Sequence, residues 1–205
     1  MKVNSIKFKK HSFTYKNIIN SRLYFSNNKS TFHSQNLKYL KGFRNNFGIL
    51  DISKIELSLK KALKLIYNLN KKKKRILFVG LPDLKENFLS ANSLHDFVSE
   101  NYWVSGILSN KTSVLNNLKY KNASKLFAPI SVMGKTTNPD IIVILNNNFE
   151  KNFLTEIYQS NIPVISLINY NHNFEKIDFK IFGCIQHKES KNFFYSLLQT
   201  ALEKK

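Results

Sequence analysis

Lysine and arginine side chains are the groups in this chain best suited to a chemical task, and that task would be the neutralisation of phosphate. Residues 71–75 read Lys-Lys-Lys-Lys-Arg, five cations in succession. The chain has 32 lysines and arginines against 13 aspartates and glutamates, a formal net charge of +19 in 205 residues. Such a charge opposes compaction unless a polyanion neutralises it, so the composition favours RNA or DNA as a partner, with an anionic membrane second.

Codon usage in a genome rich in A and T is the alternative source of the lysines. Lys, Asn, Ile, Phe and Tyr are all abundant, and arginine occurs only at Arg22, Arg44 and Arg75. This bias explains lysine in place of arginine, but it does not explain the shortage of Asp and Glu. We therefore keep a polyanion as the predicted partner.

Other kinds of chemistry find little support in the sequence. The turn after Gly80 lacks the further glycines of a phosphate-binding loop, and Asp83 puts a carboxylate where a phosphate would lie. His95 has no residue at a spacing suited to a ligand set or a base, and we expect it at the edge of a packed face. Cys184 is the single cysteine, which excludes an internal disulfide and a cysteine zinc site. We predict no cofactor, no metal and no enzymatic activity.

The elements that would position the cations alternate between strands and helices. The apolar run at residues 76–79, closed by Gly80, predicts a strand buried on both faces of a parallel sheet. Further strands are predicted at residues 102–104, 139–145, 161–168 and, at an edge, 178–183. Helices are predicted at residues 54–69, 84–99, 149–159 and 190–202. Ser53 and Glu56 match a capping box at the start of the first helix.

The predicted fold class is α/β, a three-layer domain with a mainly parallel sheet of the Rossmann-like or flavodoxin-like kind. The α/β domain is expected over residues 49–205, with residues 113–138 as a loop. Residues 1–48 contain no acidic residue and include a glycine-bracketed loop at 42–48. This segment is either an organelle transit peptide or a basic arm that lies along nucleic acid, and we favour the arm for most of it.

Several segments resemble motifs of a known family, the second protein of the small ribosomal subunit in its bacterial and organellar form. The most specific is residues 103–110, Trp-Val-Ser-Gly-Ile-Leu-Ser-Asn, which resembles the family's Trp-Leu-Gly-Gly-Met-Leu-Thr-Asn. Residues 75–80 match its Lys-Ile-Leu-Phe-Val-Gly strand, and residues 139–144 resemble its Pro-Asp-hydrophobic strand. In the same order along the chain, four further segments resemble family motifs: residues 37–45, 49–54, 162–165 and 177–183.

The departures from the family pattern point to a mitochondrial form. Family members carry a long helical hairpin after the tryptophan segment, and only residues 113–138 are available for it here. Ser105 replaces a glycine and Phe182 a proline of the family motifs. Such erosion, together with heavy use of Lys and Asn, favours a mitochondrial over a bacterial or plastid origin.

The resemblance implies a structural constituent of the mitochondrial small ribosomal subunit, in the matrix, near the head–body junction on the solvent side. Its partners would be small-subunit rRNA and neighbouring ribosomal proteins, with no membrane and no small-molecule substrate. The residues expected to contact RNA are Arg22, Lys38, Lys41, Arg44, Asn45, Trp103, Asn110 and Lys111, with Lys71 and Lys72 after them. For each lysine, a solvated surface is the alternative.

Two other classes of function remain open at this point. One is a nucleotide- or cofactor-binding enzyme on a Rossmann-like sheet, which the turn after Gly80 disfavours. The other is an RNA- or membrane-surface-binding module that works outside the ribosome.

Overall fold

The structure is a computed structural model of the 205-residue chain. It describes residues 15–28, 34–80, 95–98, 103, 105–106, 108–110, 114, 138–145, 151–168, 177–184 and 187–203. The chain divides into two compact units. Unit 1 comprises Met1–Asn68, Leu167–Glu175 and Lys180–Lys205, and unit 2 comprises Leu69–Ser166 and Lys176–Phe179. The predicted division into residues 1–48 and 49–205 stays a prediction.

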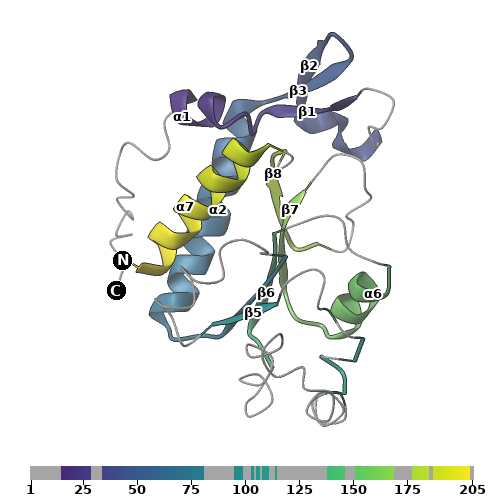
Figure 1. Cartoon of the computed structure of the whole chain (residues 1–205), viewed down its shortest axis with the longest axis vertical. Helices are drawn as coiled ribbons and strands as arrows, with labels where there is room; N and C mark the ends of the chain where they lie inside the picture. The colour runs from purple at the N-terminus through teal and green to yellow at the C-terminus, as the bar shows by residue number, and fades with distance from the viewer. Residues whose placement is uncertain are drawn as a thin grey trace. The chain divides into compact units, whose positions relative to one another are not determined.

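A small antiparallel sheet lies near the start of unit 1 (Figure 1). Its strand order is β1-β3-β2. The described elements before the long helix are α1 (Tyr15–Asn20), β1 (Phe25–Asn28), the 3-10 helix η2 (Ser34–Tyr39), β2 (Leu40–Arg44) and β3 (Phe47–Leu50). The glycine-bracketed segment 42–48 is therefore a hairpin rather than the expected loop. Asn45 and Asn46 form its two-residue turn with φ of 48° and 65°, a conformation that asparagine tolerates better than most residues.

Helix α2 (Ile52–Lys71) begins two residues earlier than the capping prediction placed it. The Asp51 Oδ1 accepts a hydrogen bond from the Ser53 N–H at 3.0 Å, so Asp51 is the N-cap and the predicted Ser53–Glu56 box is wrong. Glu56 instead forms an ion pair with Lys60 one turn later. Helical spacing predicted an inward stripe of Ile55, Leu59, Ala62, Leu63, Ile66 and Leu69. The first five are buried, as predicted, whereas Leu69 is only partly buried.

Hydrogen bonds connect the segment after α1 to residues near the C-terminus, within unit 1. The buried Ser190 Oγ donates to the Ser21 carbonyl at 2.6 Å, and the Cys184 N–H donates to the Leu23 carbonyl at 3.0 Å. Gly183 lies so close to Leu23 that a β-carbon there would come within 2.9 Å of its Cδ2. Helix α7 (Lys188–Glu203) agrees with the helix predicted over 190–202. Of its predicted inward residues, Phe194, Leu197, Leu198, Ala201 and Leu202 are buried, whereas Phe193 is only partly buried.

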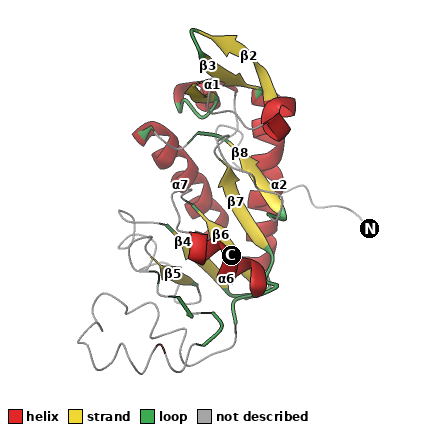
Figure 2. Ribbon diagram, turned by 90° about the vertical axis from the view of Figure 1, so that its right-hand side faces the viewer, coloured by secondary structure: helices red, strands yellow, loops and turns green. Residues whose placement is uncertain are grey.

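The larger sheet has the order β5-β4-β6-β7-β8 (Figure 2). Its strands are β4 (Ile76–Val79), β5 (Asp96–Val98), β6 (Ile141–Ile144), β7 (Val164–Ile168) and β8 (Phe179–Phe182). The pairs β4–β5, β4–β6 and β6–β7 are parallel. Every residue of β4 and β6 is buried, as their unbroken apolar runs predicted, and β8 is the predicted edge strand. The α/β class with a mainly parallel sheet is confirmed.

Strand β5, which pairs with β4 at the edge of the sheet, was wrongly predicted as part of a helix. Residues 96–98, expected within a helix over 84–99, form strand β5, in which Asp96 pairs with Leu77 and Val98 with Val79. Trp103, expected in a strand over 102–104, lies outside any strand. Residues 81–94, which hold the rest of that helix and Asp83, lie outside the described residues, as does the predicted loop over 113–138 except for residues 114 and 138.

Helix α6 (Lys151–Gln159) precedes β7 in the chain and belongs to unit 2. It agrees with the helix predicted over 149–159. No helix within the described residues combines the length and the apolar character needed to cross a membrane. The described residues also contain no group of three His, Cys, Asp or Glu side chains that could hold a metal ion.

Candidate functional site

A buried carboxylate organises the segment around the chain's single tryptophan. Glu156 on α6 is 8% exposed. Its Oε2 accepts hydrogen bonds from the Trp103 indole N–H at 3.2 Å and the Gly106 N–H at 3.1 Å. Its Oε1 accepts from the N–H groups of Leu108 at 2.8 Å and Ser109 at 3.3 Å. Because both oxygens are satisfied by charge-assisted hydrogen bonds, the buried charge is compatible with the fold.

We call residues 103–110 the tryptophan loop; residues 104 and 107 lie outside the described part of the chain. The Trp103 ring packs edge-on against Phe153, with centroids 4.5 Å apart and an interplanar angle of 88°. Phe153 precedes Glu156 by three positions, so one face of α6 supplies both the apolar contact and the carboxylate. Trp103 is half-buried, and its indole N–H already donates to Glu156.

Gly106 allows the tryptophan loop to turn back on itself. Its φ is 93°, in the left-handed region, and an added β-carbon would lie 3.2 Å from Val114 Cγ2. The Asn110 N–H donates to the Gly106 carbonyl at 2.7 Å, and the Val114 N–H donates to the Asn110 carbonyl at 3.2 Å. The side chains of Ser105, Ser109 and Asn110 are left exposed.

Sequence reasoning missed Glu156, although the sequence carried a signal. Phe153 and Ile157 recur at helical spacing and are buried, and Glu156 falls on the same stripe. A carboxylate on the apolar face of a helix requires hydrogen-bond donors from elsewhere in the fold. That position could therefore have been singled out, but the donors could not.

Two carboxylates neutralise the last cations of the run at residues 71–75. The buried Asp96 forms an ion pair with the Arg75 guanidinium at 2.6 Å. Asp140 forms an ion pair with Lys74 at 3.0 Å and accepts a hydrogen bond from the Arg75 N–H at 2.9 Å. Lys71 and Lys72 are exposed, and within the described residues neither has an ion pair. Within the described residues, Lys74 and Arg75 are thus paired with carboxylates, whereas Lys71 and Lys72 are exposed and form no ion pair.

The surroundings of Asp140 also shift its pKa. Burial by itself raises this pKa, but hydrogen bonds and positive charge from Lys74 and Arg75 together hold it below its ordinary value of 3.8. The unfolded state therefore binds the proton more tightly than the folded state. The ion pair therefore stabilises the fold at pH values above the ordinary pKa of 3.8. This contribution is lost as the pH falls through the lowered pKa of the folded state.

The remaining predicted contact residues lie in unit 1. Lys38 is exposed on η2, with its Nζ 5.1 Å from the Tyr39 ring centroid. Lys41 and Arg44 are exposed on β2, and Asn45 is exposed in the turn that follows. Arg22 is exposed in the turn after α1, with φ of 56°.

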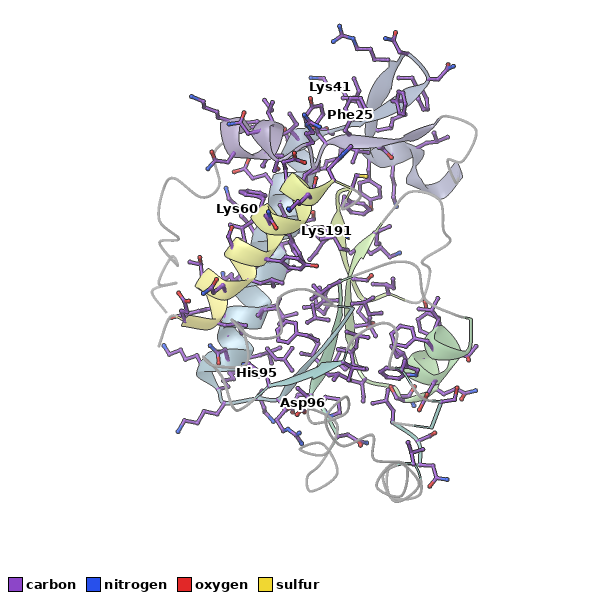
Figure 3. The ribbon with its side chains drawn as sticks, viewed as in Figure 1. Phe25, Lys41, Lys60, His95, Asp96 and Lys191 are labelled. Atoms are coloured by element: carbon purple, nitrogen blue, oxygen red, sulfur yellow. The ribbon has the colours of Figure 1, made fainter. Side chains whose placement is uncertain are left out.

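Aromatic side chains accompany these cations on the small sheet. Arg44 pairs with Phe47 across the hairpin, and the Phe47 ring lies 5.5 Å from the Phe25 ring. Phe43 and Phe47 are 39% and 40% exposed. Figure 3 labels Phe25 and Lys41 on this sheet. A surface with cations, exposed aromatic rings and no carboxylate between residues 15 and 50 has the composition of an RNA-binding surface.

The predicted contact residues thus fall into two groups. Arg22, Lys38, Lys41, Arg44 and Asn45 belong to unit 1, whereas Lys71, Lys72, Trp103 and Asn110 belong to unit 2. Lys111 lies outside the described residues. Their contact with RNA stays a prediction.

A pocket in unit 2 bears on the enzyme alternative. It is lined by residues near the start of β7, among them Tyr158, Pro163, Val164 and Asp178. The Asp178 Oδ2 accepts a hydrogen bond from the Val164 N–H at 2.8 Å, so this carboxylate completes the strand's backbone bonding. Open α/β sheets bind their ligands at the carboxyl ends of the strands. This pocket lies at the amino end of β7, which does not support a cofactor site of that kind.

Comparisons with known proteins agree with the family suggested by the motifs. A family model described as "Ribosomal protein S2" matches residues 18–131 and 120–205. A "Small ribosomal subunit protein uS2" from Carsonella ruddii is 30% identical over 193 residues, which cover 79% of this chain and 87% of that protein.

Proteins of the same name from two other bacteria are also similar. The one from Ehrlichia canis is 23% identical over 93% of this chain and 75% of its own length. The one from Bartonella quintana is 25% identical over 83% of this chain and 77% of its own length. The family model matches most of this chain, and the Carsonella ruddii protein is 30% identical to it. The chain therefore belongs to the ribosomal protein S2 family.

Proposed function

We propose that this chain is a structural constituent of a mitochondrial small ribosomal subunit. The observation that carries the proposal is family membership, because the relatives described above are each named as a protein of the small ribosomal subunit. The net charge of +19 supports it independently, since RNA would supply the polyanion that such a chain requires. The role is non-enzymatic.

The mitochondrial assignment rests on the sequence. The short segment over residues 113–138 and the heavy use of Lys and Asn distinguish the chain from the bacterial family pattern. Within the ribosome we place it on the solvent side near the junction of head and body, beside neighbouring ribosomal proteins.

The proposed mechanism is neutralisation of rRNA phosphates combined with recognition of shape. In unit 1, Arg22, Lys38, Lys41 and Arg44 would contact phosphates, and Asn45 would approach the backbone from the hairpin turn. In unit 2, Lys71, Lys72 and Lys111 would contact phosphates. Trp103 and Asn110 of the tryptophan loop are the other predicted contacts of this unit. Binding of this kind weakens steeply as salt rises.

Reversing the charge at the hairpin turn tests this mechanism. Arg44→Glu is expected to lower the small-subunit rRNA recovered with the tagged chain by about tenfold, because it replaces an attraction to phosphate with a repulsion. The measurement is quantitative recovery of rRNA after affinity purification from mitochondria. Lys61→Glu is the matched control, since Lys61 is exposed on α2 and is not among the predicted RNA contacts. Equal recovery with both variants would reject the assignment of Arg44.

A further inference from the structure

The arrangement around Glu156 links a buried residue to the predicted RNA contacts on the tryptophan loop. We propose that Glu156 is a positioning residue for RNA binding: by gathering the N–H donors of the tryptophan loop, its carboxylate holds the loop in the shape that presents Ser105 and Asn110 to rRNA. The inference rests on the proposed function, because it assigns a role to Glu156 in that RNA contact. It also reassigns Trp103 from a direct contact to a part of the support.

The donors of the loop are already in use on its inner side. Four N–H groups, from Trp103, Gly106, Leu108 and Ser109, point at the two oxygens of Glu156 at 2.8–3.3 Å. The Ser109 hydroxyl adds a longer contact at 3.5 Å. N–H groups converging in this way form an anion-binding site, and here a side chain of the same chain fills it. A phosphate would therefore have to meet the outer side of the loop.

The outer side carries neutral polar groups. Ser105 and Asn110 are exposed, and Asn110 is held by its backbone bonds to Gly106 and Val114. Neutral side chains bind RNA through hydrogen bonds that depend strongly on direction. Their contribution therefore requires the loop to be fixed before binding, which is the task we assign to Glu156.

The charge of Glu156 is essential to this arrangement, because each of its hydrogen-bond partners in the described part of the chain is a donor. Glu156→Gln keeps the shape but replaces one acceptor oxygen with an NH₂ group. Whichever way the amide is turned, that NH₂ faces either the pair from Trp103 and Gly106 or the pair from Leu108 and Ser109. Two donors then lose their acceptor and the loop is released.

The test is incorporation of the full-length tagged chain into small ribosomal subunits, measured on sucrose gradients. Glu156→Gln is expected to lower incorporation by about tenfold or more, because two donors lose a charged acceptor. Glu189→Gln is the matched control, because Glu189 is exposed on α7 and the substitution removes the same charge. Charge alone predicts that both variants bind a polyanion at least as well as the wild type. Only a positioning role predicts loss in Glu156→Gln alone.

The loop itself can be followed without RNA, because Trp103 is the only tryptophan. In the purified chain, Glu156→Gln is expected to move tryptophan emission to longer wavelength and to increase quenching by acrylamide. Ile157→Val controls for stability, since Ile157 is buried beside Glu156 on α6 and offers no acceptor. It should leave both emission and incorporation as in the wild type.

The outcomes separate the inference from the function on which it rests. A wild-type chain absent from small subunits overturns the proposed function. Wild-type incorporation together with normal incorporation of Glu156→Gln overturns the role of Glu156 alone. If Glu156→Gln does not fold, Trp103→Phe decides: it keeps a ring on Phe153 and removes one donor, so incorporation should fall about threefold. Unchanged incorporation of Trp103→Phe would then overturn the inference.

Discussion

Replacing Asp96 with alanine is expected to lower the free energy of unfolding by about 3–5 kcal/mol, the cost of leaving a buried charge without its partner. Asp96 is 3% exposed and its carboxylate lies 2.6 Å from the Arg75 guanidinium. Asp96 begins β5, and Arg75 immediately precedes β4. The ion pair therefore joins the starts of two adjacent parallel strands. Urea unfolding followed by circular dichroism measures the loss.

Asp140→Ala is the matched control for this prediction. Asp140 contacts the same stretch of chain, through Lys74 and the Arg75 N–H, but its side chain is 34% exposed. Removing the Asp140 carboxylate should lower the free energy of unfolding by about 1 kcal/mol, because water can hydrate the groups that lose their hydrogen-bond partner. Replacing both members of the buried pair, as in Arg75→Met with Asp96→Leu, should recover most of the loss. Equal costs for Asp96→Ala and Asp140→Ala would contradict this account of the pair.

Lowering the pH from 6.5 to 4 is expected to remove about 3 kcal/mol of stability through His95 alone. Burial lowers the pKa of His95 from 6.5 to about 4. Its Nε2 lies 3.2 Å from Asn70 Oδ1, and its ring meets Phe78 edge-on at 6.1 Å. Figure 3 shows His95 beside Asp96 at the start of β5. The expected position at the edge of a packed face is corrected by its burial, at 4% exposed.

The direction of this effect follows from proton binding. Between pH 6.5 and 4 the unfolded chain binds a proton at His95 that the folded chain excludes. The stabilisation is thus fully present above 6.5 and is lost as the pH falls towards 4. In His95→Gln the free energy of unfolding should depend less steeply on pH over this range than it does in the wild type. An unchanged slope in His95→Gln would contradict the assignment.

The sequence predicted best those helices and strands whose apolar residues alone determine which faces are buried. The unbroken apolar runs of β4 and β6 and the helical stripe of α2 predicted buried strands and a helix, because a doubly buried strand tolerates no polar position. The strand predicted over 161–168 was found as β7 at Val164–Ile168, and it begins after Pro163 rather than before it. These features need only local chain geometry and hydrophobicity.

It was least informative where a partner distant in sequence decided the outcome. β5 has three residues, one of them Asp96, whose burial depends on Arg75 twenty-one positions earlier. Glu156 was missed for the same reason: its donors come from residues 103–109, and no periodicity links the two segments.

Sedimentation of a mitochondrial lysate through a sucrose gradient at moderately high salt tests the central claim most directly. The chain is located in the fractions by mass spectrometry. The proposed function predicts that it migrates with the small ribosomal subunit and stays there when weakly bound basic proteins are removed by salt. Recovery of the chain only in the soluble fractions at the top of the gradient would contradict a ribosomal role.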